Sequence, residues 1–254
     1  MELLSELLKN QSNMTGMTST SMTTEYDGNE YLHRWGLDNV QCEKCHNTGY
    51  ITEIRDGILY SNPCSCLKER VSKRRLKQSG MEDMAARNTF DNFSAETKQL
   101  AKIKDAADRY ANNPSGWFYL CGRSGSGKTH LCTAMCQTII KAGTEVGMMM
   151  WREDSRRLKA MVNDPEAETL LHDLKNIPVL YIDDFFKGGI TEADVRLAFE
   201  ILNYRYNNSW LLTIISSEYD LKSVFGSDEA LASRIYERAK GNVFKMPDKN
   251  WRIT

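Results

Sequence analysis

The stretch Gly122-Arg-Ser-Gly-Ser-Gly-Lys-Thr129 decides how the rest of the chain is interpreted. It has the spacing Gly-x4-Gly-Lys-Thr, which is typical of loops that bind the phosphates of a nucleotide. An apolar, aromatic run at 116–121 precedes it and indicates a buried strand, and residues 129–141 carry apolar side chains at helical spacing. A flexible Gly/Ser linker is the alternative interpretation, and this strand–loop–helix context disfavours it. The stretch therefore predicts a nucleotide-binding protein of the α/β class.

Phosphate binding needs a tight loop whose backbone N–H groups point inward, which explains glycine at 122, 125 and 127. In such a loop Lys128 reaches the β- and γ-phosphates of ATP, and the Thr129 hydroxyl ligates Mg²⁺. The following helix adds the positive end of its dipole at the same place. We assign the whole stretch to nucleotide binding, namely Gly122, Arg123, Ser124, Gly125, Ser126, Gly127, Lys128, Thr129 and His130.

A second apolar run, Val179-Leu-Tyr-Ile-Asp-Asp184, ends in two acids and has the pattern of a Walker B strand. After a phosphate-binding loop, Asp183 is expected to hold the Mg²⁺ shell and Asp184 to orient the attacking water. The alternative is a structural pair of acids at a strand end. Hydrolysis also needs a cation at the γ-phosphate, and the helix predicted over 228–238 offers Arg234 and Arg238. On the residues alone these arginines, and the serines at 216 and 217, are weak signals.

Helices and short apolar strands alternate from Met81 onward, which predicts a parallel sheet covered by helices on both faces. The expected helices cover 95–112, 129–141, 152–175, 191–206 and 228–238, and further strands cover 145–151 and 210–216. The chain has 254 residues with 33 basic and 34 acidic side chains, so its net charge of −1 provides no general attraction for nucleic acid or anionic membrane. No apolar run approaches the roughly 18 residues that span a bilayer. We expect a cytoplasmic protein.

Four cysteines lie in two pairs, Cys42-Glu-Lys-Cys45 and Cys64-Ser-Cys66. Between them, two β-prone runs flank Asp56-Gly57, a dipeptide typical of hairpin turns, and a hairpin would bring the pairs together. Four thiolates suit a tetrahedral, structural Zn²⁺ site. His46 is a possible substitute ligand, and an iron–sulfur cluster or four reduced cysteines without metal are the alternatives.

The rest of the N-terminal region is polar. Residues 1–9 predict a short amphipathic helix that either packs locally or docks into a partner, and residues 10–24 predict a linker. Residues 68–77 form a dense basic run, which is either a solvated connecting helix or a contact for nucleic-acid phosphates or an acidic partner. Gly80 is expected to end this helix. We therefore predict two domains, an N-terminal zinc-binding, partner-binding module over 1–80 and an ATPase domain over 81–254.

With these motifs in order, the chain resembles the DnaC/IstB-like group of AAA+ ATPases, most closely the bacterial and phage replicative-helicase loaders of the DnaC and DnaI types. The resemblance covers roughly Thr89 to Trp251. It rests on Thr89-Phe-Asp-Asn-Phe93, the phosphate-binding loop, the Walker B run, Thr213-Ile-Ile-Ser-Ser217 and Ser233-Arg-Ile-Tyr-Glu-Arg238. The cysteine-bearing module also looks like that of DnaI-type loaders.

The resemblance implies an AAA+ fold and several roles. Phe90 and Phe93 would border the adenine pocket, Ser216 or Ser217 would act as sensor 1, and Arg234 would be an arginine finger reaching the ATP of a neighbouring subunit. It also implies self-association on ATP, a hexameric replicative helicase as partner, and single-stranded DNA as a ligand of the basic run and of Arg152, Arg156, Arg157 and Lys159. Two departures stand out: Glu218 lies where many relatives carry asparagine, and only residues 239–254 follow Arg238, too few for the usual helical lid.

Two rival functions remain open on the sequence. The first is a transposition helper ATPase of the IstB type, which would have a transposase as partner and duplex DNA as substrate. The N-terminal cysteine module argues against it. The second is a zinc-containing adaptor that binds ATP as a switch and hydrolyses little of it. Asp184 argues against this adaptor.

Overall fold

The computed structural model describes residues 42–46, 48–55, 58–161, 164–251 and 253 of the chain. The predicted helix over 1–9, the linker over 10–24 and the Asp56-Gly57 turn lie outside these residues. Among the described residues, no helix is both long and apolar enough to cross a membrane.

A five-stranded parallel sheet forms the centre of the fold, with the strand order β4-β5-β6-β3-β7. The strands are β3 (Phe118–Cys121), β4 (Val146–Met150), β5 (Val179–Phe185), β6 (Leu212–Ser217) and β7 (Val243–Lys245). Strand β3 lies between β6 and β7, with Tyr119 opposite Ile215 on one side and Val243 on the other. All of β3 is buried, as expected for a strand covered on both faces. The predicted parallel α/β fold is confirmed.

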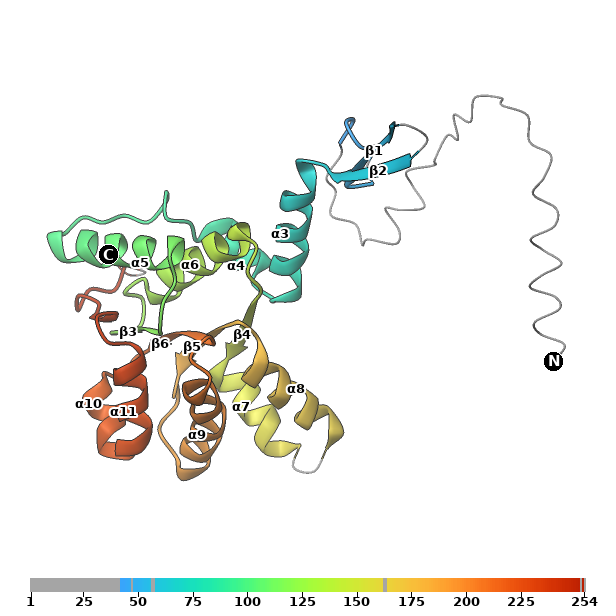
Figure 1. Ribbon diagram of the computed structural model, residues 1–254. Coiled ribbons are helices and arrows are strands. Elements are labelled where there is room, and N and C mark those ends of the chain that lie inside the picture. Colours follow the sequence, from blue (N-terminus) through green and yellow to red (C-terminus); the bar gives the residue numbers. More distant parts are fainter. Residues whose placement is uncertain (1–41, 47, 56–57, 162–163, 252, 254) are drawn as a thin grey trace, which may run out of the picture.

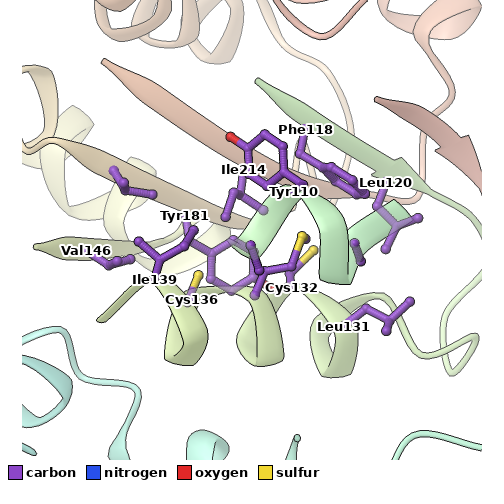
Figure 2. Close-up of a cluster of buried hydrophobic side chains, with 14 of the residues drawn as sticks. Tyr110, Phe118, Leu120, Leu131, Cys132, Cys136, Ile139, Val146, Tyr181 and Ile214 are labelled. Atoms are coloured by element: carbon purple, nitrogen blue, oxygen red, sulfur yellow. The ribbon is translucent and has the colours of Figure 1, made fainter. Parts of the chain in front are cut away.

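Helices cover both faces of this sheet (Figure 1). On one face lie α4 (Glu82–Arg87), α5 (Lys98–Asn112) and α6 (Lys128–Ala142). On the other lie α7 (Trp151–Ala160), α8 (Pro165–Asn176), α9 (Glu192–Asn207), α10 (Leu221–Ser227) and α11 (Glu229–Arg238). Each face has its own hydrophobic cluster. Figure 2 shows the first, in which Cys132, Cys136 and Ile139 of α6 face side chains from the strands.

The structure differs from the predicted helices at one point and adds three elements. The single helical region expected over 152–175 is two helices, because Asp164 caps a new helix whose first residue is Pro165. The Asp164 carboxylate accepts a hydrogen bond of 2.8 Å from the N–H of Glu166. Helices α4 and α10 and strand β7 were not predicted, since all three are too short to show a clear periodicity.

A buried arginine joins three of these elements. Arg205 of α9 has no exposed surface and donates five hydrogen bonds. Its acceptors are the Thr213 hydroxyl and the backbone carbonyls of Leu174, Lys175, Ile177 and Leu212, at 2.6–3.1 Å. Burial lowers its pKa to about 9, which leaves the guanidinium charged at neutral pH. Arg205 therefore holds the end of α8 to the beginning of β6.

The N-terminal module begins with an antiparallel hairpin of β1 (Tyr50–Arg55) and β2 (Ile58–Pro63), as predicted. Helix α3 (Cys66–Gln78) follows and contains the whole of the basic run. Figure 1 shows the hairpin at the far end of α3, apart from the sheet. The middle of α3 lies against α6, where the Ser72 hydroxyl donates to the carbonyl of Ile140 at 3.4 Å. The division into two domains near Gly80 stays a prediction.

Candidate functional site

The phosphate-binding loop runs from β3 into α6, and its glycines have the backbone conformations that the sequence led us to expect. Gly122, Gly125 and Gly127 all have positive φ angles, of 148°, 75° and 97°. A side chain with a Cβ rarely adopts such angles. Gly127 is also the N-cap of α6, so the loop ends at a helix N-terminus, where anions bind favourably.

Two buried polar side chains in the loop fit a phosphate ligand. Lys128 is 4% exposed, and its ammonium donates to the carbonyls of Gly122 and Arg123 at 2.9 and 3.0 Å. Burial lowers the pKa of Lys128, so the loop would gain from an anion beside it. The Ser126 hydroxyl is buried and has no hydrogen-bond partner among the described residues. Buried polar groups without partners are rare and indicate a place for a polar ligand.

The two predicted Mg²⁺ ligands lie side by side at the end of the loop. The Thr129 hydroxyl is 3.1 Å from Oδ1 of Asp183. The same carboxylate oxygen accepts hydrogen bonds from the Tyr181 hydroxyl at 2.5 Å and from the Ser216 hydroxyl at 2.6 Å. These oxygens are hard ligands of the kind that Mg²⁺ prefers. A residue that the sequence did not indicate, Tyr181, therefore fixes the orientation of Asp183.

Asp184 differs from Asp183 in both backbone and surroundings. It has a φ of 51°, in the left-handed region, at an irregularity in the β5–β6 pairing. Its N–H donates to the Ser216 hydroxyl at 3.0 Å. Burial, followed by the neighbouring charge of Asp183, raises the pKa of its carboxyl group. Left-handed conformations at residues other than glycine cluster at functional sites, so the backbone of Asp184 is consistent with a functional role.

The two serines at the end of β6 are fully buried and bonded within the protein. Ser216 contacts both acids of β5, and the Ser217 hydroxyl donates to the carbonyl of Phe185 at 2.8 Å. Both hydroxyls therefore order the carboxyl end of β5. The assignment of either serine as sensor 1 stays a prediction.

The segment at 89–93 lies against the beginning of α6. Nε2 of His130 is 2.8 Å from the Thr89 carbonyl oxygen and 2.9 Å from Oδ1 of Asn92. The Phe93 ring meets the His130 ring edge to face, with centroids 5.1 Å apart. Phe93 also approaches Gly127 so closely that a Cβ there would lie 3.0 Å from the ring. The segment thus borders the loop, and the adenine-binding role of Phe90 and Phe93 stays a prediction.

A C-terminal segment that the sequence did not single out lies on the other side of the loop. The N–H of Met246 donates to Cys121 at 2.7 Å, and the N–H of Trp251 donates to Gly125 at 3.0 Å, both to backbone carbonyls. A Cβ on Gly125 would lie 2.0 Å from Oδ1 of Asn250. These contacts explain why Gly125 has no side chain. Nothing in the composition of residues 246–251 signals this role.

The predicted arginine finger lies on α11, where its described contacts are with α9 and α11. Nε of Arg234 donates to Asn203 at 2.9 Å, and Nη1 donates to the carbonyl of Ala230 at 2.9 Å. Its guanidinium also lies 4.9 Å from the centre of the Phe199 ring. Arg234 therefore approaches no residue of its own phosphate-binding loop in these contacts. Its predicted role needs a second subunit.

The basic residues of α7 divide into two groups. Arg157 lies 3.4 Å from a carboxylate oxygen of Glu166, and Lys159 lies 2.5 Å from one of Asp194. Arg152 and Arg156 are exposed. Of the four basic residues of α7, Arg152 and Arg156 are therefore the more accessible to a ligand from solution.

The four cysteines come together as the sequence predicted. The Sγ atoms of Cys42, Cys45, Cys64 and Cys66 all lie within 4.8 Å of one another. Cys42 and Cys64 are 3.7 Å apart, and Cys45 and Cys66 are 3.5 Å apart. A tetrahedral zinc with Zn–S bonds of about 2.3 Å would separate its sulfurs by about 3.8 Å. His46 is not part of the cluster.

Hydrogen bonding within the cluster also fits a metal. A backbone hydrogen bond involving Cys66 is the main reason why the pKa of Cys64 is lowered to about 6, which favours the thiolate that binds metals. The N–H of Gly49 donates to Sγ of Cys45 at 3.3 Å, an outer contact that stabilises a thiolate ligand. Hence four protein ligands are available and the site suits a structural zinc.

Comparison with known proteins gives one family match. A model of the IstB-like ATP-binding proteins matches residues 57–250. Protein XkdC of the phage-like element PBSX from Bacillus subtilis is 32% identical over 77% of this chain and 78% of its own length. The uncharacterized protein YqaM of the same organism is also 32% identical, over a match that covers 71% of this chain and 62% of the length of YqaM. The replicative helicase loader DnaC of Buchnera aphidicola is 28% identical over 66% of this chain and 69% of its own length.

Solved structures agree with the fold. A crystal structure of DnaI superposes with a TM-score of 0.56 at 22% identity and covers 66% of this chain and 92% of that one. A crystal structure of the DnaC helicase loader superposes with a TM-score of 0.54 at 23% identity and covers 65% of this chain and 99% of that one. At these identities the structures support the AAA+ type of fold alone.

Proposed function

The chain belongs to the family of IstB-like ATP-binding proteins, and we propose that it is an ATPase that loads a replicative DNA helicase onto single-stranded DNA. One observation carries the enzymatic part of this proposal. Thr129 and Asp183, an Mg²⁺-ligand pair, lie 3.1 Å apart at the end of the phosphate-binding loop, and Asp184 follows directly. This is the arrangement that transfer of phosphate to water requires.

Each residue of the site has a distinct task in hydrolysis. The loop and Lys128 would bind the β- and γ-phosphates of ATP, and Thr129 and Asp183 would hold Mg²⁺. When bound, Mg²⁺ neutralises charge on the phosphate oxygens. Asp184 accepts a hydrogen bond from the attacking water and orients it toward the γ-phosphate. Phe90 and Phe93 border the adenine ring.

Charge stabilisation at the γ-phosphate would come from a neighbouring copy of the chain. Arg234 lies on α11, and its contacts with Asn203 and Ala230 hold its guanidinium in place; among the described residues, neither of these partners is a carboxylate. In a ring or filament of subunits it would meet the next subunit's ATP. ATP binding therefore favours assembly, and hydrolysis requires it.

The N-terminal module would bind the helicase. Its hairpin exposes Ile58, Leu59 and Tyr60, at 58%, 66% and 46%. Exposed apolar side chains grouped on one strand are a usual feature of protein-binding surfaces. The zinc site would hold this hairpin rigid. The exposed Arg152 and Arg156 would contact the phosphates of single-stranded DNA, and the protein would act in the cytoplasm.

Co-elution with a hexameric replicative helicase from the same source tests the loader proposal. We expect the full chain to co-elute in the presence of ATP, and we expect the Cys42→Ser variant to lose the helicase while it still binds ATP. Arg196→Met, on the exposed face of α9, is the matched control. If the wild-type chain does not bind the helicase, the loader proposal is refuted.

The family match itself favours a second candidate, a helper ATPase for a transposase. Both candidates share the ATPase domain and differ in partner. Co-elution with a transposase and duplex DNA, but not with the helicase, would establish this second candidate. Asp184→Asn separates both enzymes from an ATP-binding adaptor, because only an enzyme loses its function with this change.

A further inference from the structure

A lysine lies beside the acid that orients the attacking water. Asp184 and Phe186 both have left-handed backbone angles, with φ of 51° and 62°. The turn between them is closed by a hydrogen bond of 2.8 Å from the N–H of Lys187 to the Asp184 carbonyl. This tight turn brings the Lys187 ammonium back to the Asp184 carboxylate, at 3.9 Å.

The same ammonium forms a close ion pair and hydrogen bond with Glu218. Glu218 is the first residue after β6, the strand next to β5, so both residues lie at the same edge of the sheet. Neither side chain is fully open to solvent, since Lys187 is 28% exposed and Glu218 is 33% exposed. The pair is therefore more strongly coupled than an ion pair on the open surface.

Three carboxylates and two ammonium groups thus gather at the mouth of the phosphate-binding loop. Asp184, Glu218 and Lys187 all act electrostatically on Lys128. Asp183 and Glu218 both repel the charge of Asp184, and Lys187 and Lys128 oppose this repulsion, so loss of Lys187 would leave Lys128 as the remaining cation of this group. Asp184 has a side chain that is 38% exposed, so repulsion would move it toward solvent and away from the water that it must orient.

We propose that Lys187, anchored by Glu218, is a positioning residue that holds the Asp184 carboxylate in its catalytic orientation. Glu218, the first residue after β6, holds the Lys187 ammonium in place, and Lys187 in turn holds the Asp184 carboxylate. This inference rests on the proposed ATPase function. It concerns the turnover step more than ATP affinity, because the direct contacts of the Lys187 ammonium in the described part of the chain are with Asp184 and Glu218, whereas its effect on Lys128 is electrostatic alone.

Steady-state ATP hydrolysis by full-length variants tests the proposal. Lys187→Met is expected to lower kcat by about tenfold or more with KM for ATP changed by less than about twofold, because only the orientation of the water is lost. Lys187→Arg keeps the charge and is expected to retain most of kcat. The matched control is Lys175→Met, which breaks the 2.7 Å ion pair between Lys175 and Glu200 away from the site.

A second variant tests the anchor. Glu218→Gln alone is expected to lower kcat, and the double variant Lys187→Met/Glu218→Gln is expected to be no slower than Lys187→Met. Non-additivity of this kind shows that the two residues act as one unit. If Lys187→Met folds poorly, Glu218→Gln by itself still tests the anchor through its expected decrease in kcat.

Three outcomes would overturn the inference. Lys187→Met could behave like Lys175→Met, the two changes could add independently, or KM could rise while kcat stays unchanged. Asp184→Asn in the same assay separates the inference from the proposed function. If Asp184→Asn abolishes hydrolysis and Lys187→Met does not, only the inference fails. If Asp184→Asn still hydrolyses ATP, both fail.

Discussion

Replacement of Arg205 with methionine tests how much the buried arginine contributes to the stability of the ATPase fold. The change removes all five hydrogen bonds and keeps a long apolar side chain. Three of the acceptors, the carbonyls of Leu174, Lys175 and Ile177, lie at and just after the end of α8. The carbonyl of Leu174 depends on Arg205 in particular. In a helix its donor would be the N–H four residues later, but that residue is Pro178, which has no N–H.

The magnitude follows from these acceptors. A buried carbonyl left without a donor costs about 1–3 kcal/mol, so three of them give a gross loss of about 3–9 kcal/mol. Methionine returns part of this loss through apolar contacts and through the removal of a buried charge, and we expect a net loss of about 3–5 kcal/mol. For a domain of this size that corresponds to a decrease in Tm of about 10 °C. Lysine at 205 keeps the charge with fewer donors, and it should lose about half as much.

Urea and thermal unfolding followed by circular dichroism measure this loss. Arg196→Met is the matched control, because Arg196 lies on the same helix, is exposed, and pairs only with Glu192 four residues earlier in the described contacts. Its effect should stay within about 0.5 kcal/mol. A free energy of unfolding for Arg205→Met within about 1 kcal/mol of the wild type would refute the reasoning, because it would mean that the hydrogen bonds only offset the cost of burying the charge.

Three further changes have definite expected results. Cys45→Ser should reduce bound zinc from one per chain to nearly none by elemental analysis while the unfolding of the sheet domain changes little; full zinc content would contradict the four-cysteine site. Tyr181→Phe removes a buried hydrogen bond to a carboxylate and should cost about 1.5–3 kcal/mol in urea unfolding, with a higher Mg²⁺ concentration needed for half-maximal hydrolysis. An unchanged Mg²⁺ requirement would show that the Tyr181 hydroxyl does not support the metal ligand Asp183. Trp251→Pro removes the N–H that donates to Gly125 and should weaken binding of a fluorescent ATP analogue about fivefold, whereas Trp251→Phe should not; equal affinities would show that this contact does not support the loop.

The sequence predicted those parts of the site whose chemistry lies in consecutive residues. The loop, the Walker B run and the two cysteine pairs each carry their spacing with them, so the fold class and the meeting of the four cysteines followed directly. The sequence did not identify Tyr181 as part of the site, because a tyrosine in an apolar strand indicates only burial. Ser216 reaches the Asp183 carboxylate, which Tyr181 also contacts, only through the pairing of β5 with β6. Lys187 and Glu218 are distant in sequence, so their pairing needed the structure.

The position of β3 in the sheet has a consequence for synthesis of the chain. Both of its neighbouring strands, β6 and β7, and the segment at 246–251 that contacts the loop are made after β3 itself. A nascent chain therefore has its phosphate-binding sequence long before it has the surfaces that shape it, since the ribosome delivers residues from the N-terminus onward. Nucleotide cannot be held in its final site until β7 has been added. The N-terminal hairpin, whose contacts are local, can fold first and be available to a partner while the rest is still being translated.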